Sequence, residues 1–163
     1  MSTRIRLATP EDIDSILAMS RGLAEEVGDP PPGLTAETFQ RDAFGPEAWF
    51  QAFIAESAER SVGYALLNRV FDPQTGTRGL FMTDLYVAPA ERSRGLGKAI
   101  MQALARYAQE VDSHWMAWDV PDNAERARAF YESLGAEPRE KLFKLSTMVL
   151  MEDALNALAA DEG

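Results

Sequence analysis

The sequence contains no cysteine and only one histidine, His114. Without cysteine the chain has no disulfide bond, no thiolate nucleophile and no cysteine ligand for a metal ion. A single histidine is too little for a histidine-based catalytic triad or a histidine-rich metal site. We therefore expect no metal centre and no cysteine chemistry.

Long apolar runs are also absent, and no segment approaches the roughly 20 residues needed to cross a bilayer. The N-terminal residues 1–6 carry no apolar stretch after their charges, so no secretory signal is visible. A cytoplasmic location is the expectation, with no membrane partner.

Basic residues are few relative to acidic ones, with 16 Lys and Arg against 26 Asp and Glu, for a net charge of −10. Such a surface repels phosphate backbones, so we expect no nucleic-acid partner. It attracts a cationic small molecule instead. The same charge could serve solubility alone, and composition does not choose between the two interpretations.

The hydrophobic pattern predicts a mixed α/β fold in a single domain over residues 1–163. With 46% apolar and 26% charged residues, the composition is typical of a globular domain that buries a core without crosslinks. Period-two segments predict strands at 4–7, 50–55, 62–70, 81–87, 115–120 and 142–145. Period-3.6 segments and capping residues predict helices at 9–27, 35–44, 96–111, 124–134 and 148–159.

Residues 81–100 are the most informative segment, because a strand runs into a glycine-bearing turn that opens a long amphipathic helix. Glycine lets backbone N–H groups approach a ligand, and a helix N-terminus carries partial positive charge, so together they suit a pyrophosphate. Arg92, Arg94 and Lys98 add positive charge. An ordinary surface turn with solvated arginines is the alternative.

Two nucleotide motifs are excluded at this turn. A Walker loop needs glycine where Arg92 stands and serine or threonine where Ala99 stands. A dinucleotide fingerprint needs a third glycine, which the residues after Gly97 do not supply.

The turn resembles the coenzyme-A loop of the GNAT acetyltransferase superfamily, whose pattern is Arg/Gln-x-x-Gly-x-Gly/Ala. Arg92, Gly95 and Gly97 fill that pattern. Residues 116–120 and 129–136 are similar to the family's fifth strand and the helix after it, and residues 5–12 to its opening strand and helix. Segments 42–45, 70–73 and 83–87 look more narrowly like the spermidine/spermine and thialysine (diamine) acetyltransferase branch.

The resemblance implies a GNAT fold, with a mostly antiparallel central sheet flanked by helices and acetyl-CoA in a cleft between the fourth and fifth strands. It implies direct acetyl transfer to a primary amine of a small cationic acceptor (a polyamine, a diamine or a thialysine-like molecule), and a homodimer. Two alternatives stay open. The acceptor could be an amino acid or a peptide N-terminus, or the chain could be a catalytically weak acyl-CoA-binding sensor.

The resemblance also implies the site residues. Tyr131 matches the usual general acid, and Asp84 is the carboxylate nearest the acetyl group. Coenzyme A would contact Leu85, Tyr86, Val87, Arg92, Ser93, Arg94, Gly95, Leu96, Gly97, Lys98, Asn123 and Tyr131. The acceptor's ammonium groups would meet Glu26, Asp42, Asp72 and Asp84.

Two positions depart from the family pattern. The branch usually has Glu-Asp where this chain has Thr83 and Asp84, so Asp84 or an ordered water must act as the base. The asparagine that commonly begins the last catalytic helix falls on Ala124, one position after Asn123. Asn123 reaches coenzyme A after a local shift or caps the helix together with Asp122, and capping is the more ordinary role.

Overall fold

The computed structural model describes residues 3–138 and 156. The chain divides into two compact units, Met1–Pro121 and Asp122–Gly163, and each is described by itself. The predicted strand at 142–145 lies outside the described residues. So does the predicted helix at 148–159, apart from Asn156, which is helical.

The first unit is built on a five-stranded sheet in the order β1-β2-β3-β4-β5. The strands are β1 (Thr3–Leu7), β2 (Gln51–Ser57), β3 (Arg60–Asp72), β4 (Thr77–Val87) and β5 (Trp115–Trp118). Neighbours are antiparallel except β4 and β5, which are parallel. The mixed α/β class and the mostly antiparallel sheet are therefore confirmed, and β3 and β4 are longer than predicted.

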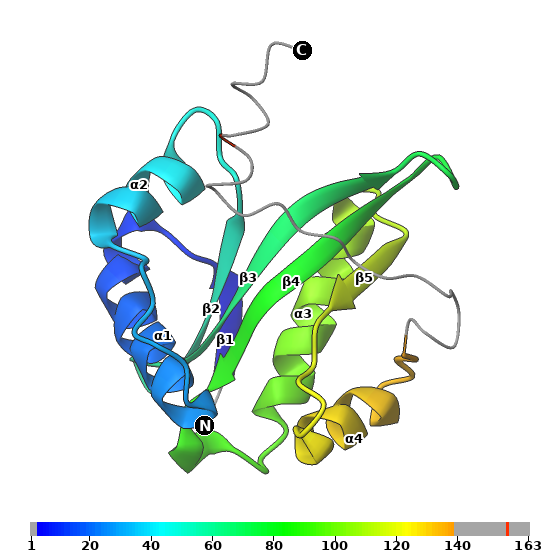
Figure 1. The fold of residues 1–163 in the computed structure, drawn as a ribbon. Helices are drawn as coiled ribbons and strands as arrows, with labels where there is room; N and C mark the ends of the chain where they lie inside the picture. Colours follow the sequence, from blue (N-terminus) through cyan, green and yellow to red (C-terminus); the bar gives the residue numbers. More distant parts are fainter. Residues whose placement is uncertain (1–2, 139–155, 157–163) are drawn as a thin grey trace. The chain divides into compact units, whose positions relative to one another are not determined.

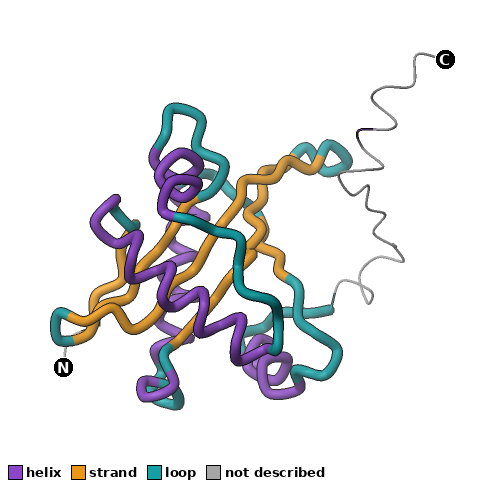
Figure 2. The backbone as a smooth tube through the Cα atoms, turned by 60° about the vertical axis from the view of Figure 1, so that its left-hand side comes forward, coloured by secondary structure: helices purple, strands orange, loops and turns teal. Residues whose placement is uncertain are grey.

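Helices cover both faces of this sheet. They are α1 (Ile13–Val27), preceded by the 3-10 turn η1 (Pro10–Asp12), then α2 (Ala36–Phe44) and α3 (Leu96–Glu110), preceded by η2 (Pro89–Glu91). Figure 1 shows α1 and α2 on one side of the sheet and α3 on the other, and Figure 2 shows α1 lying across the strands. None of the described helices is long and apolar enough to cross a membrane.

The core on the α1 and α2 face follows from alternation along the strands. Side chains two residues apart point to the same face of a sheet, so Ile54, Tyr64 and Leu66 pack with Ile16 and Phe39 from the two helices. On the other face, the ring of Phe53 meets Tyr107 of α3 edge-on, with centroids 5.2 Å apart. The apolar stripe expected on the helix at 96–111 is confirmed within α3, where five of its members are buried: Leu96, Ile100, Ala103, Leu104 and Tyr107. The sixth expected member, Val111, is the C-cap residue and is half-buried.

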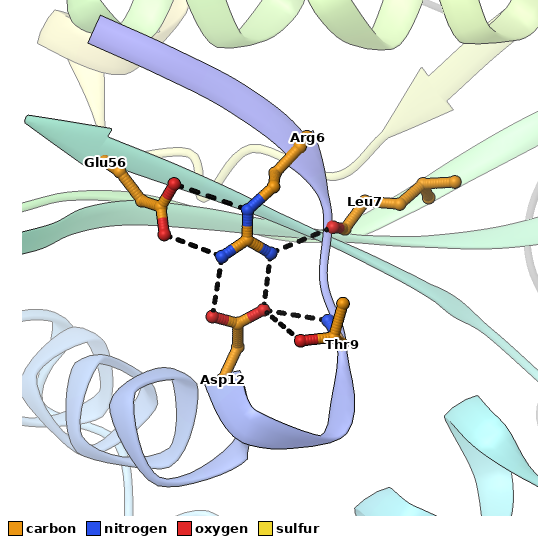
Figure 3. A network of polar contacts seen from close by, with 5 residues as sticks. All are labelled: Arg6, Leu7, Thr9, Asp12 and Glu56. Carbon is orange, nitrogen blue, oxygen red and sulfur yellow. Dashed lines mark hydrogen bonds and ion pairs between the residues drawn. The ribbon is translucent and has the colours of Figure 1, made fainter. Parts of the chain in front are cut away.

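A charged network joins β1, η1 and β2 (Figure 3). Arg6 donates to both carboxylate oxygens of Asp12 at 2.6 and 3.0 Å, and to both oxygens of Glu56 at 2.6 and 3.3 Å. The backbone N–H of Thr9 donates to Asp12 at 2.8 Å, which completes a capping box at the helix start. Thr9 is the N-cap, as the sequence predicts.

The second unit contains α4 (Glu125–Ser133). Ala127, Phe130 and Tyr131 of this helix are half-buried. Gly135 follows the helix in the left-handed conformation with φ 90°, as the sequence predicts for a helix stop.

Candidate active site

The β4 strand runs on past its pairing with β5. The two strands pair only from Gly79 to Met82, whereas β4 continues to Val87 (Figure 1). No described strand pairs with this far half of β4 on the side away from β3. That edge therefore presents backbone groups that a ligand can bind as an added strand would.

A β-bulge decides which groups face the unpaired side. Leu66 pairs with Asp84 and Leu67 with Met82, so Thr83 is the extra residue on β4. Before the bulge, the carbonyl of Arg78 faces the β5 side, where it accepts from the N–H of His114. The backbone N–H and carbonyl groups of successive residues face the two edges of a strand in turn, and the extra residue at the bulge reverses this alternation.

After the bulge, the backbone N–H and carbonyl groups of the even-numbered residues face β3, since the N–H of Ala88 donates to the carbonyl of Val62 at 2.9 Å. The N–H and carbonyl groups of Leu85 and Val87 therefore point to the unpaired side. Both residues are among those that the sequence resemblance assigns to coenzyme A.

The loop after β4 forms a turn whose geometry depends on glycine. Ser93 and Gly95 have φ of 62° and 82°, and Gly95 is the residue before the first turn of α3. The first N–H groups of a helix have no partner within the helix and lie at its positive end. A Cβ added at Gly95 would meet no atom within 4 Å, so this side of the turn is open.

The side chains of this loop fall into two groups. Leu96 is buried and packs in the core, which leaves only its backbone for a ligand. Ser93, Arg94 and Lys98 are exposed, and Arg94 donates to Glu91 at 3.3 Å. The exposed group can therefore reach a bound anion.

Arg92 points inward rather than outward. Its Nε donates to the carbonyl of Val87 at 2.8 Å, and its two terminal nitrogens donate to the two carboxylate oxygens of Glu26 at the end of α1. Its guanidinium also lies 5.7 Å from the centroid of the Tyr86 ring. The hydrogen bonds to Glu26 raise the pKa of Arg92. The first residue of the loop motif thus ties the loop to α1 and to the end of β4.

Three of the four predicted acceptor-binding carboxylates have other contacts. Glu26 pairs with Arg92. Asp42 pairs with the neighbouring Arg41 at 2.7 Å, and this hydrogen bond lowers the pKa of Asp42. Asp72 accepts from the backbone N–H of Gln74 at 2.9 Å, which makes it a turn residue at the β3–β4 tip. That tip is roughly 20 Å along β4 from Asp84 at the usual strand rise.

The fourth carboxylate, Asp84, lies at the bulge. Its Oδ2 accepts from the hydroxyl of Tyr64 at 2.7 Å. Burial raises the pKa of Tyr64 well above its ordinary value, and the charge of Asp84 raises it further. This phenol therefore stays protonated and acts as a donor. Tyr64 is not among the site residues predicted from the sequence. Its place in an apolar strand looks like a core position, and only the strand register shows that it faces Asp84.

The remaining candidates lie in the second unit. Tyr131 is half-buried beside Phe130, with ring centroids 5.1 Å apart, and burial raises its pKa. The predicted capping role of Asn123 is wrong. The residue at the N-cap of α4 is Ala124, which makes no side-chain cap bond, because the helix begins one position later than predicted.

Comparison with known proteins gives the family. The sequence profile of the Acetyltransferase (GNAT) family matches residues 18–136. Thialysine N-epsilon-acetyltransferase of Mus musculus is 31% identical over 145 residues, covering 83% of this chain and 85% of that protein. Spermidine/spermine N(1)-acetyltransferase-like protein 1 of Homo sapiens is 30% identical over 142 residues, covering 82% of this chain and 20% of that protein.

Among solved structures, a probable acetyltransferase matches with a TM-score of 0.79 at 22% identity, covering 91% of this chain and 99% of that chain. This likeness concerns the fold alone. The sequence matches show that the chain belongs to the GNAT acetyltransferase family and is an N-acetyltransferase. Because GNAT acetyltransferases use acetyl-CoA as the acetyl donor, acetyl-CoA is its cofactor. The resemblance to the thialysine and spermidine/spermine branch is confirmed.

Proposed function

We propose that the chain acetylates a primary amine of a small cationic acceptor, a polyamine, a diamine or a thialysine-like molecule. The observation that carries this proposal is the carboxylate of Asp84 at the bulge, directly before Leu85 and Val87, whose backbone groups face the side of β4 that has no described partner strand. A carboxylate at that point can attract an ammonium group to the place where an acyl group would bind. The net charge of −10 and the similarity to thialysine N-epsilon-acetyltransferase favour the same class of acceptor.

The described residues fit acetyl-CoA. The N–H and carbonyl of Leu85 and the N–H of Val87, on the side of β4 without a described partner strand, suit an amide-containing arm, which can pair with a strand edge. The open turn at Gly95, the N-terminus of α3 and the exposed side chains of Arg94 and Lys98 suit a pyrophosphate. We assign these residues to the cofactor, together with the backbone of residues 92–98 and with Asn123 and Tyr131 from the second unit.

In this proposal acetyl-CoA supplies the activated acetyl group, and the chain supplies orientation and proton transfer. An alkylamine is protonated at neutral pH, so Asp84, or a water bound to it, removes the proton that frees the nitrogen lone pair. The backbone N–H groups of Leu85 and Val87 donate toward the acyl oxygen. Bound acetyl-CoA would give its acetyl group to the amine nitrogen and leave as the thiolate of coenzyme A, and the Tyr131 hydroxyl would donate the proton that this thiolate takes up.

We further propose that residues 1–163 act as one N-acetyltransferase domain, because the family match at 18–136 extends across the division between the two units. A homodimer and a cytoplasmic location belong to the proposal on the strength of the resemblance alone. Light scattering coupled to gel filtration tests the first of these.

The first experiment measures release of free coenzyme A with a thiol reagent, using acetyl-CoA and separate pools of polyamines, lysine analogues and short peptides. The chain has no cysteine, so it adds no thiol background. We expect release with the polyamine or lysine-analogue pool. Release with peptides alone would overturn the acceptor class. Silence with every pool, while acetyl-CoA still raises the melting temperature, would mean that the acceptor lies outside these pools or that the chain is an acyl-CoA-binding sensor, and either result would overturn the proposed acceptor class.

A further inference from the structure

Tyr64 on β3 and Asp84 on β4 are brought together by the strand register. Tyr64 pairs with Tyr86, and Asp84 is two residues before Tyr86, so Tyr64 and Asp84 are diagonal neighbours on the same face. Diagonal neighbours on a sheet are within reach of each other when one is a long aromatic side chain. The bulge at Thr83 is essential to this arrangement, since without it Asp84 would point to the opposite face.

Burial makes the contact between the two side chains obligatory. Tyr64 has a relative exposure of 0%, and its hydroxyl donates to Oδ2 of Asp84 at 2.7 Å. A buried hydroxyl that lacks a partner is costly, so this donor has no solvent alternative. Ser20 of α1, also buried, acts on the same phenol and lowers its pKa, which places it near the Tyr64 hydroxyl. The phenol is therefore held by Asp84 on one side and lies close to Ser20 of α1.

Asp84 differs from Tyr64 in being partly exposed. Its Oδ1 accepts no hydrogen bond from any described residue, whereas its Oδ2 is held by Tyr64. The carboxylate thus has one oxygen fixed to the protein interior and one available on the accessible side. A neutral donor such as tyrosine fixes a carboxylate without neutralising its charge, which a Lys or Arg partner would do.

We propose that Tyr64 is a positioning residue for Asp84, and that its hydroxyl holds Oδ2 so that Oδ1 receives the ammonium group of the acceptor. The inference rests on the proposed function and deepens it. It also accounts for the departure at Thr83, because a single carboxylate that must act without the branch's usual glutamate gains from a fixed orientation.

A double-mutant cycle tests the pair, with Tyr64→Phe, Asp84→Asn and the double variant. The measured quantities are kcat/KM for the amine that supports turnover and KM for acetyl-CoA. We expect Tyr64→Phe to lower acceptor kcat/KM by about 10- to 100-fold, the size of a hydrogen bond to a charged group, with KM for acetyl-CoA unchanged. In the Asp84→Asn background, the same change should alter kcat/KM by less than about twofold.

Tyr107→Phe is the matched control, because Tyr107 is a buried tyrosine on the α3 face that packs against Phe53. It should keep wild-type kinetics. Equal losses from Tyr64→Phe in both backgrounds, or wild-type activity in Tyr64→Phe, would overturn the positioning role while leaving the proposed function standing. A wild-type protein that is silent with every amine would overturn both.

Asp84→Glu provides a second test in case Tyr64→Phe does not fold. It keeps the charge and moves the carboxylate by one methylene relative to the Tyr64 hydroxyl. We expect acceptor kcat/KM to fall about tenfold or more with KM for acetyl-CoA unchanged. Wild-type kcat/KM in Asp84→Glu would contradict the requirement for a fixed carboxylate.

Discussion

The guanidinium of Arg92 and the carboxylate of Glu26 form a bidentate ion pair, although the two residues are 66 positions apart in the sequence. It joins the loop before α3 to the last turn of α1. Since Arg92 also donates to the carbonyl of Val87, one side chain fixes both the end of β4 and the start of the loop. A residue that the loop motif associates with the cofactor therefore acts here by holding the loop in shape.

This relationship predicts a selective effect on the cofactor. Glu26→Gln removes the carboxylate charge, and with it the ion pair to Arg92 that attaches the loop to α1. Because the two side chains are 44% and 30% exposed, the effect should be modest. We expect KM for acetyl-CoA to rise about two- to fivefold, with KM for the acceptor unchanged.

Steady-state kinetics at varied acetyl-CoA check this prediction. Glu25→Gln is the matched control, since Glu25 is an exposed glutamate one position earlier on the same helix. If Glu26→Gln instead raised KM for the amine alone, Glu26 would belong to the acceptor site, as the sequence analysis predicts.

A second prediction concerns Tyr131 as the general acid. Tyr131→Phe should lower kcat by about 10²- to 10⁴-fold, the usual contribution of a positioned proton donor. Burial raises the pKa of Tyr131 above the ordinary value for tyrosine, near 10, so the phenol keeps its proton throughout neutral and mildly alkaline pH. The ratio of wild-type to variant kcat should therefore be constant from about pH 7 to pH 9.

The pH profile of kcat for both proteins provides the measurement. A ratio that falls toward one within that range would mean that Tyr131 loses its proton there, which conflicts with an acid of raised pKa. Tyr107→Phe again serves as the control for the loss of a tyrosine hydroxyl.

The sequence predicts the elements of this fold well where burial follows a regular period. The stripe of α3 and the strand β1 are examples, because each repeats with the spacing of its own secondary structure. The ends of β3 and β4 are predicted poorly. Residues 71–72 and 77–80 lie outside the predicted strands 62–70 and 81–87, and they form strands because they pair with each other next to a tight turn.

The candidate site, like the fold, can be predicted from the sequence only in part. The loop at Arg92, Gly95 and Gly97 is visible in the sequence because the turn itself requires glycine and a helix start. The contacts of Tyr64 with Asp84 and of Arg92 with Glu26 are not visible. Both depend on strand register and on segments far apart in the chain, and a one-residue bulge decides which face Asp84 occupies.

A third prediction concerns stability at the Arg6 network (Figure 3). The hydrogen bond from Arg6 lowers the pKa of Asp12 below its ordinary value. A carboxylate with a lowered folded-state pKa stabilises the fold above its unfolded pKa, near 3.9, and loses that contribution as the pH falls through the lower folded value. Asp12→Asn should therefore reduce the free energy of unfolding by about 2 kcal/mol at neutral pH.

Urea unfolding of wild type and variant at a series of pH values checks both the size and the sign. The difference between the two proteins should shrink as the pH falls below about 4. Asp14→Asn, an exposed aspartate in the first turn of the same helix, should cost about 0.5 kcal/mol or less. A difference for Asp12→Asn that grows toward acidic pH would contradict the assigned sign.

The last prediction follows from the close approach of Gly79 to the first residue of β5. Gly79 pairs with Trp115, and a Cβ added at Gly79 would lie 2.1 Å from the Trp115 ring. The indole cannot easily move aside, because its Nε1 donates to Thr77 at 3.2 Å. Gly79→Ala should destabilise the protein by about 2–3 kcal/mol through this clash, and it should shift the short β4–β5 pairing that ends at Met82.

Gly33→Ala is the matched control, since a Cβ there meets no atom within 4 Å. Denaturant unfolding measures the stability, and KM for acetyl-CoA reports on the adjoining edge of β4. A Gly79→Ala variant as stable as Gly33→Ala would mean that β4 and β5 do not pair in the register described.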